Sequence, residues 1–178
     1  MATCSISPSL KAGNRSSVNV RELTELAVLC AIMVGGKEAM NALPNIHPVM
    51  LIILLCVRVY GVKALYPVTG FVVIESLLYG LSIWTISYLY IWPLAALLAL
   101  FFRSEGSKLF WGVYAAVFGF LFGPLSALIT LILSGWRAAV AYWVAGIPYD
   151  VIHCISNFII VYFLLNPLYN LVMKIRNT

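Results

Sequence analysis

Six apolar segments follow one another along most of the chain, and their length limits what it can fold into. A helix needs about 20 apolar residues to cross a bilayer, where it satisfies its backbone hydrogen bonds internally. Because 63% of the 178 residues are hydrophobic and only 10% are charged, too few polar side chains remain to cover a water-soluble domain. We therefore expect an all-α integral membrane protein with six transmembrane helices.

The expected helices cover residues 20–42, 48–62, 64–86, 88–102, 109–133 and 149–165, and a short helix at 136–145 could lead into the last one. The second helix is short for a span, so we expect it to stand steeply, to lie where the bilayer is locally thin, or to be buried by its neighbours. Residues 1–19 are polar and contain no apolar core of the kind that a signal peptide has. We interpret them as a cytosolic tail, followed by a six-helix membrane domain over residues 20–178.

Lysine and arginine residues predict the orientation of these helices. With both termini cytosolic, the inner side carries nine of them: Lys11, Arg15, Arg21, Arg58, Lys63, Arg103, Lys108, Lys174 and Arg176. The outer side then carries only Lys37 and Arg137. This asymmetry follows the positive-inside rule. It also accounts for the net charge of +5 without a nucleic-acid partner, because the charges lie at helix ends.

A narrow polar stripe marks the last apolar segment. In a helix, Asp150, His153 and Asn157 occupy positions i, i+3 and i+7, within an arc of about 60°. A carboxylate at the centre of a lone membrane helix costs about 2.5–3.5 kcal/mol on insertion scales. The stripe must therefore face protein, water or a ligand, and we expect the rest of the chain to enclose it.

Small residues recur at every fourth position of the first helix: Ala27, Ala31, Gly35 and Ala39. Similar rows occur in the fifth helix: Gly112 with Ala116, and Gly119 with Gly123. Such rows let helix backbones approach closely in a membrane. We expect the fifth helix to pack within the chain, whereas the first could pack within the chain or against another subunit.

Further polar and aromatic side chains are candidates for a site. Glu75 lies within the apolar run 71–78 and needs either a hydrogen-bonding partner or a water-filled cavity. Aromatic residues gather toward the expected outer side: Trp84, Tyr88, Tyr90, Trp92, Trp136, Tyr142, Trp143 and Tyr149. They could form an interfacial belt or the wall of a pocket for a large organic molecule. The loop after the first helix, with Asn45 and His47, could be an ordinary solvated loop or a lid.

Several enzyme and metal motifs are absent from the sequence. It contains no Walker-type phosphate loop, no HExxH and no nucleophile elbow. Two histidines are too few for a convincing metal site, so we expect none. An intramembrane enzyme that uses Asp150 and His153, and a structural membrane subunit without a ligand, remain as alternatives to a binding protein.

Four stretches together resemble a known family: the Ala27-xxx-Ala31 row, residues 43–48 (LPNIHP), residues 87–93 (SYLYIWP) and residues 146–153 (GIPYDVIH). Over residues 20–175 the chain resembles the substrate-binding S component of an energy-coupling factor (ECF) vitamin transporter. That resemblance implies a multi-pass protein of a bacterial cell membrane that captures a vitamin from outside and is not itself an enzyme. Its partners would be a transmembrane scaffold subunit and two cytosolic ATPases, which would bind ATP and Mg, so this chain would hold no cofactor. Ala27 and Ala31, extended by Gly35, would form the docking surface.

The resemblance also bears on the ligand. The start Met1-Ala2-Thr3 departs from the Met-His start of the nickel and cobalt members, which argues against a metal ion as substrate. The runs at 87–93 and 146–153 are most similar to cobalamin-type S components of lactic-acid bacteria, so cobalamin is the expected vitamin. Pantothenate is the alternative, with Lys37 or Arg137 pairing its carboxylate. The expected substrate-binding residues are Asp150, His153, Asn157, Tyr149, Trp92, Tyr88, Trp84, Trp143, Lys37, Asn41, Arg137 and Glu75.

Overall fold

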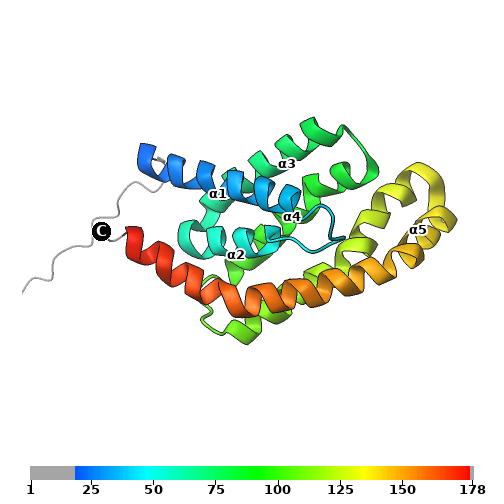
Figure 1. The fold of residues 1–178 in the computed structure, drawn as a ribbon. Coiled ribbons are helices and arrows are strands. Elements are labelled where there is room, and N and C mark those ends of the chain that lie inside the picture. Colours follow the sequence, from blue (N-terminus) through cyan, green and yellow to red (C-terminus); the bar gives the residue numbers. More distant parts are fainter. Residues whose placement is uncertain (1–18, 177–178) are drawn as a thin grey trace, which may run out of the picture.

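The computed structural model describes residues 19–176, and every regular element in that range is a helix (Figure 1). The elements are α1 (Val20–Ala39), α2 (Val49–Tyr60), the 3-10 turn η1 (Gly61–Ala64), α3 (Leu65–Tyr79), α4 (Ile83–Phe101) and α5 (Lys108–Arg176). The predicted all-α fold is therefore confirmed. The predicted tail lies outside the described residues, apart from Asn19, whose side chain accepts a hydrogen bond from Glu22 N and caps α1.

The short helix α2 lies in the interior of the protein. Every residue of α2 except Arg58 is buried, and α2 packs against α1, α4 and α5. A segment enclosed by other helices need not match the bilayer thickness, so the 12 residues of α2 are compatible with this interior position. The turn η1 connects α2 to α3, and Gly61, with a φ of 62°, interrupts the helix between them.

The boundary between α3 and α4 differs from the prediction. The helix predicted over 64–86 ends at Tyr79, and α4 begins at Ile83 instead of residue 88. Gly80 adopts a φ of 72°, a left-handed conformation that favours glycine and ends α3. Ser82 and Thr85 then form a capping box that starts α4. The apolar side chains on both sides concealed these two local signals.

The long helix α5 consists of two limbs that fold back on each other at Gly135, where φ is 82° and ψ is 173° (Figure 1). We call residues 108–134 the first limb and residues 136–176 the second limb. The predicted interruption before residue 149 was wrong, because the second limb runs from the bend through Pro148 and Pro167 to Arg176. Proline is tolerated in a membrane helix where neighbouring groups compensate for the lost backbone hydrogen bond.

Glycines of the first limb allow the two limbs of α5 to approach closely. A Cβ added at Gly119 would lie 2.7 Å from the backbone oxygen of His153, and one at Gly112 would lie 3.1 Å from the ring of Phe158. Packing this tight brings backbone against backbone, as small-residue rows do in membranes. The prediction that these glycines pack within the chain is confirmed.

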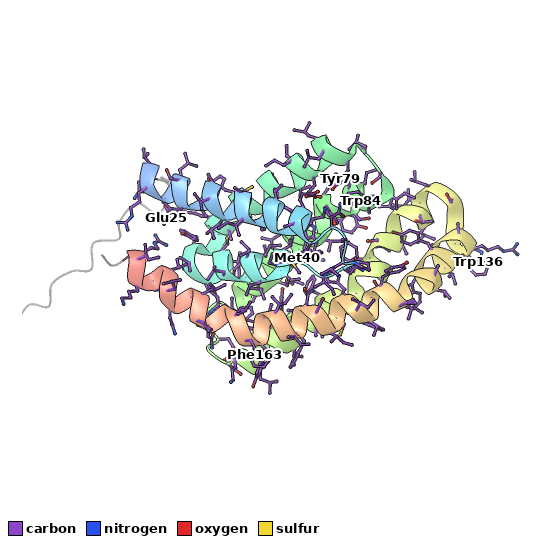
Figure 2. The ribbon with its side chains drawn as sticks, viewed as in Figure 1. Glu25, Met40, Tyr79, Trp84, Trp136 and Phe163 are labelled. Carbon is purple, nitrogen blue, oxygen red and sulfur yellow. The ribbon has the colours of Figure 1, made fainter. Side chains whose placement is uncertain are left out.

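Three helical stretches of residues 19–176 are long and apolar enough to cross a membrane: Val49–Tyr79, Ile83–Phe101 and Lys108–Arg176. The start of α1 and the end of α5 lie at one end of the molecule, and the bend of α5, near Trp136, lies at the other (Figures 1 and 2). Ion pairs hold the first end together: Lys63 Nζ is 2.5 Å from Glu22 Oε2, and Arg176 Nε is 3.4 Å from Glu25 Oε2.

Candidate functional site

Two adjoining hollows lie between the bend of α5, the start of α4 and the loop at residues 40–48. The larger, which we call the main compartment, has a volume of about 420 Å³ and is lined by α4 and both limbs of α5. The smaller, the loop compartment, has a volume of about 210 Å³ and is lined by the end of α1 and the loop itself. Asn45, Trp84 and Tyr88 line both, so the two hollows are neighbours.

The main compartment contains two buried oxygen atoms that lack partners. Asp150, on the second limb, is 3% exposed, and Ser126, on the first limb, is 1% exposed. Neither Asp150 Oδ2 nor Ser126 Oγ has a hydrogen-bond partner among residues 19–176. The carboxylate packs against Gly123, where any added Cβ would collide with it. A buried polar group without a partner is unfavourable, so these two atoms are suited to bind a ligand.

Asn45 connects the loop to the second limb and separates the two compartments. Its φ is 58°, a left-handed conformation that asparagine tolerates better than most residues. Asn45 Nδ2 donates to the backbone oxygen of Tyr149 at 3.1 Å, and Ser156 Oγ donates to the backbone oxygen of Asn45 at 3.0 Å. Two hydrogen bonds therefore join the loop at residues 40–48 to α5.

The loop compartment is bounded by a cluster of charges. Lys37 Nζ lies 2.6 Å from Glu75 Oε2 and 3.1 Å from Glu38 Oε1. The same ammonium group lies 4.8 Å from the centre of the Tyr79 ring and 5.4 Å from that of Trp84, two rings that lie close together in Figure 2. Tyr79 also donates a hydrogen bond to the Glu38 carboxylate. Glu75 thus has an ion-pair partner from α1 and does not line either hollow.

Two histidine rings pack beside the compartments. The His47 and His153 ring centres are 5.1 Å apart, and His153 also lies 5.3 Å from the ring of Phe122. Burial lowers the pKa of His47 to about 4, and the charge of Lys37 adds to the effect. His47 lines the loop compartment, whereas His153, 1% exposed, lines neither. His153 therefore packs against Phe122 and His47, which line the two compartments, without lining either compartment itself.

Asn157 was predicted to bind the substrate, but it lies farther inside the protein and lines neither compartment. Its Nδ2 donates to the backbone oxygen of Ala115 at 3.4 Å, which places it at the contact between the two limbs of α5. The predicted stripe therefore divides by depth: Asp150 lines the main compartment, His153 lies behind it, and Asn157 joins the limbs. A helical stripe runs along the axis, and only its first member reaches the hollow.

The other expected residues fall into two groups. Those that line a compartment are Trp84, Tyr88, Tyr149, Lys37 and Asn41. Trp92 is buried against His153 and Tyr88 and lines neither hollow. Trp143 lines a separate apolar cleft beside Trp136. Arg137 is exposed at the bend, with its guanidinium 5.8 Å from the Trp136 ring, so it does not fold over the site.

The sequence-based list omitted part of the wall of the main compartment. The omitted residues are Asn45, Phe122, Gly123, Ser126, Tyr142, Ala145 and Gly146. A signal was available for the first limb, because Gly119, Gly123 and Ser126 share one helical face. We interpreted that face as a packing surface only, although at the bend the two limbs separate enough to leave space between them.

The small-residue row of α1 is open. Ala27, Ala31, Gly35 and Ala39 are all exposed, and nothing lies within 4 Å of a Cβ added at Gly35. The buried residues of α1 are Leu26, Leu29, Cys30, Met33 and Lys37. The alternative that the row packs within the chain is therefore wrong for the part that the structure describes.

These features define a helical protein with an apolar exterior and a hollow at one end, lined by aromatic rings and a few unpartnered polar atoms. Large apolar side chains such as Leu77, Leu133 and Phe163 are exposed along its helices. No protein-family model, curated protein or solved structure matches the chain. Any assignment of function therefore depends on the residues and distances described above.

Proposed function

We propose that this chain is the substrate-capturing membrane subunit of an importer of the energy-coupling factor type, and that it binds a vitamin-sized nutrient. The observation that carries the proposal is the main compartment. Asp150 and Ser126, each with a buried side-chain oxygen that lacks a hydrogen-bond partner among the described residues, line a hollow of about 420 Å³ that is otherwise lined largely by aromatic rings. Hollows of this size and composition are typical of small-molecule sites.

Six spans are proposed: α1, α2 with η1, α3, α4 and the two limbs of α5. Arg21 and Arg176 lie at the end of the molecule that carries the termini, and Lys37 and Arg137 lie toward the other end. The positive-inside rule then puts both termini in the cytosol. In that orientation both compartments face the outside, where a nutrient would be captured.

The exposed row of α1 supports a partner subunit within the membrane. Ala27, Ala31 and Gly35 present a nearly flat strip of backbone, which suits close contact with a helix of a scaffold subunit. In the proposed complex, two cytosolic ATPases bind ATP and Mg and supply the energy. This chain contributes the nutrient site and the docking surface.

The geometry narrows the choice of nutrient. The two compartments, about 420 and 210 Å³, suit a ligand of ordinary drug size. Cobalamin, a corrin with amide arms and a nucleotide tail, is larger, and its entry requires the loop at 40–48 to release the contacts of Asn45. Pantothenate is also less favoured, since Lys37 is already paired with two carboxylates.

An intramembrane enzyme is less well supported than a binding protein. Such an enzyme would need Asp150 and His153 to act on the same substrate. His153 lines neither compartment, and both of its ring nitrogens are buried without a hydrogen-bond partner within residues 19–176. Its position is that of a packing residue.

The test is binding to the purified chain in detergent without ATP. A panel of cobalamin, pantothenate, thiamine, riboflavin, biotin, folate and pyridoxamine would be scored by thermal shift and by calorimetry. We expect one member to raise the midpoint of thermal unfolding, and the increase should grow with the logarithm of its concentration above the dissociation constant. Ser126→Leu fills the hollow and should abolish that shift, whereas Ser104→Leu, at an exposed site between α4 and α5, should not. A panel without any binder would refute the proposal.

A further inference from the structure

The main compartment has an acidic group and aromatic walls but no basic side chain. Of the described residues that line it, Asp150 is the only carboxylate, and none is lysine, arginine or histidine. We infer that it accepts an organic cation attached to a flat ring, an inference that rests on the proposed capture function. The features behind it are the isolated carboxylate, the rings around it and the charge balance of the neighbouring compartment.

The carboxylate of Asp150 lacks a compensating charge. Asp150 is only 3% exposed, and it takes part in none of the ion pairs within residues 19–176. Gly123 lies against Oδ2, and the Asp150 side chain borders the hollow. A buried carboxylate is strongly unfavourable unless it is paired. A cationic ligand would supply the missing partner.

The rings around Asp150 suit the same kind of ligand. Trp84, Tyr88, Phe122, Tyr142 and Tyr149 all line the main compartment. The faces of such rings attract cations, and their area suits stacking with a flat ring. Ser126 Oγ, the other oxygen without a partner, can form one further hydrogen bond with the ligand.

The surrounding charges argue against the alternatives. Beside the loop compartment, its lining residue Lys37 pairs with both Glu38 and Glu75, so one positive and two negative groups leave a net charge of −1 there when ionised. An anionic ligand would meet repulsion in both hollows. A divalent metal ion is also a poor fit, because it prefers about six oxygen ligands and the wall is mainly aromatic.

The experiment compares two probes of equal shape on the detergent-solubilised full chain: 2-phenylethylammonium and its uncharged analogue 2-phenylethanol. The wild type should bind the ammonium at least about tenfold more tightly, since ion pairing and cation–π attraction act only on the cation, whereas stacking of the phenyl ring is common to both probes. Asp150→Asn keeps the shape of the side chain and should remove that preference. Glu105→Gln, at the other end of the protein, should leave it unchanged.

Two further measurements separate a lost site from a misfolded protein. Ligand-free Asp150→Asn should unfold at no lower temperature than the wild type, because it removes an uncompensated buried charge. Tyr142→Leu, which keeps the carboxylate but removes a ring, should weaken the ammonium probe several-fold. Equal affinity for both probes, or an unchanged preference in Asp150→Asn, would overturn the inference.

The outcomes also distinguish this inference from the proposed function. If a neutral or anionic vitamin from the panel binds equally well to the wild type and to Asp150→Asn, the cation inference fails and nutrient capture stands. If neither the panel nor the probes bind the wild type, both fail. If a cationic vitamin binds and loses affinity in Asp150→Asn, both are supported.

Discussion

Lys37 Nζ lies 2.6 Å from Glu75 Oε2, and this ion pair joins the end of α1 to the middle of α3. Each residue taken alone is an unexpected charge in an apolar helix. Together they form an ion pair, and Glu38 and Tyr79 lie beside the same ammonium group. Lys37 lines the loop compartment, whereas Glu75 lies behind it and holds the Lys37 side chain in place.

Removing one member of this pair should destabilise the protein strongly. Lys37→Met leaves the fully buried Glu75 without its cation, and we expect a loss of about 3 kcal/mol in the free energy of unfolding. The double variant Lys37→Met with Glu75→Leu should recover most of that loss, because no buried charge remains. Denaturant unfolding in detergent measures both values. Arg137→Met removes an exposed charge and should change stability by less than about 0.5 kcal/mol; an equal loss there would contradict the argument.

The glycines of α5 and α1 should respond differently to alanine. In Gly119→Ala the new Cβ would meet the His153 backbone at 2.7 Å, and backbone cannot move aside as a flexible side chain can. We expect the limbs to be forced apart, with a loss of about 2 kcal/mol. Gly35→Ala adds the same atom to open space and should be neutral or slightly stabilising in the isolated chain. Thermal unfolding of the two variants side by side checks the difference.

The sequence predicted the helical class and the close packing of the first limb from composition and small-residue spacing, and burial of the short second helix was one of the alternatives that its length left open. It did not predict which charges pair. Lys37 and Glu75 each required a partner, but they are far apart in sequence, and only the packing of α1 on α3 brings them together. The helix boundary at Gly80 and Ser82 was not predicted, because the residues on both sides of it are apolar and read as one continuous helix.

The candidate site was only partly predictable for a related reason. Periodicity places Asp150, His153 and Asn157 on one face of a helix, but it does not say how far along the helix the hollow extends. The wall formed by Phe122 and Ser126 exists only because α5 reverses at Gly135 and returns alongside itself. The bend depends on the conformation of Gly135, and it brings together wall residues that are far apart in the sequence.

Acid should destabilise the protein through His47, in the loop after α1. Its pKa is about 4 in the folded protein and 6.5 ordinarily, so the unfolded chain binds a proton that the folded one does not. The contribution of neutral His47 to the free energy of unfolding is fully present above pH 6.5 and falls by about 1.4 kcal/mol per pH unit as the pH drops toward 4. His47→Asn removes this contribution, so the free energy of unfolding of the variant, measured as a function of pH, should fall less steeply toward acid pH than that of the wild type. Parallel curves for the two proteins would exclude His47 as the cause.

The open row of α1 should matter for uptake and not for binding. Ala27→Trp or Ala31→Trp places a large side chain on an exposed strip, where the isolated chain has room for it. Binding of the nutrient to the purified variants should therefore match the wild type. In cells that express the whole importer, uptake should fall at least about tenfold, because close helix contact depends on small side chains.

The matched control for that experiment is Ala141→Trp, which puts the same side chain on an exposed face of the second limb of α5. Its uptake should remain near the wild-type level, since the proposed contact with the scaffold subunit involves α1 and not this face. Equal losses at Ala31 and Ala141 would indicate a general effect of bulk on insertion or expression. Loss at Ala31 alone, with the amount of chain in the membrane unchanged, would identify the row as the surface that the scaffold subunit contacts.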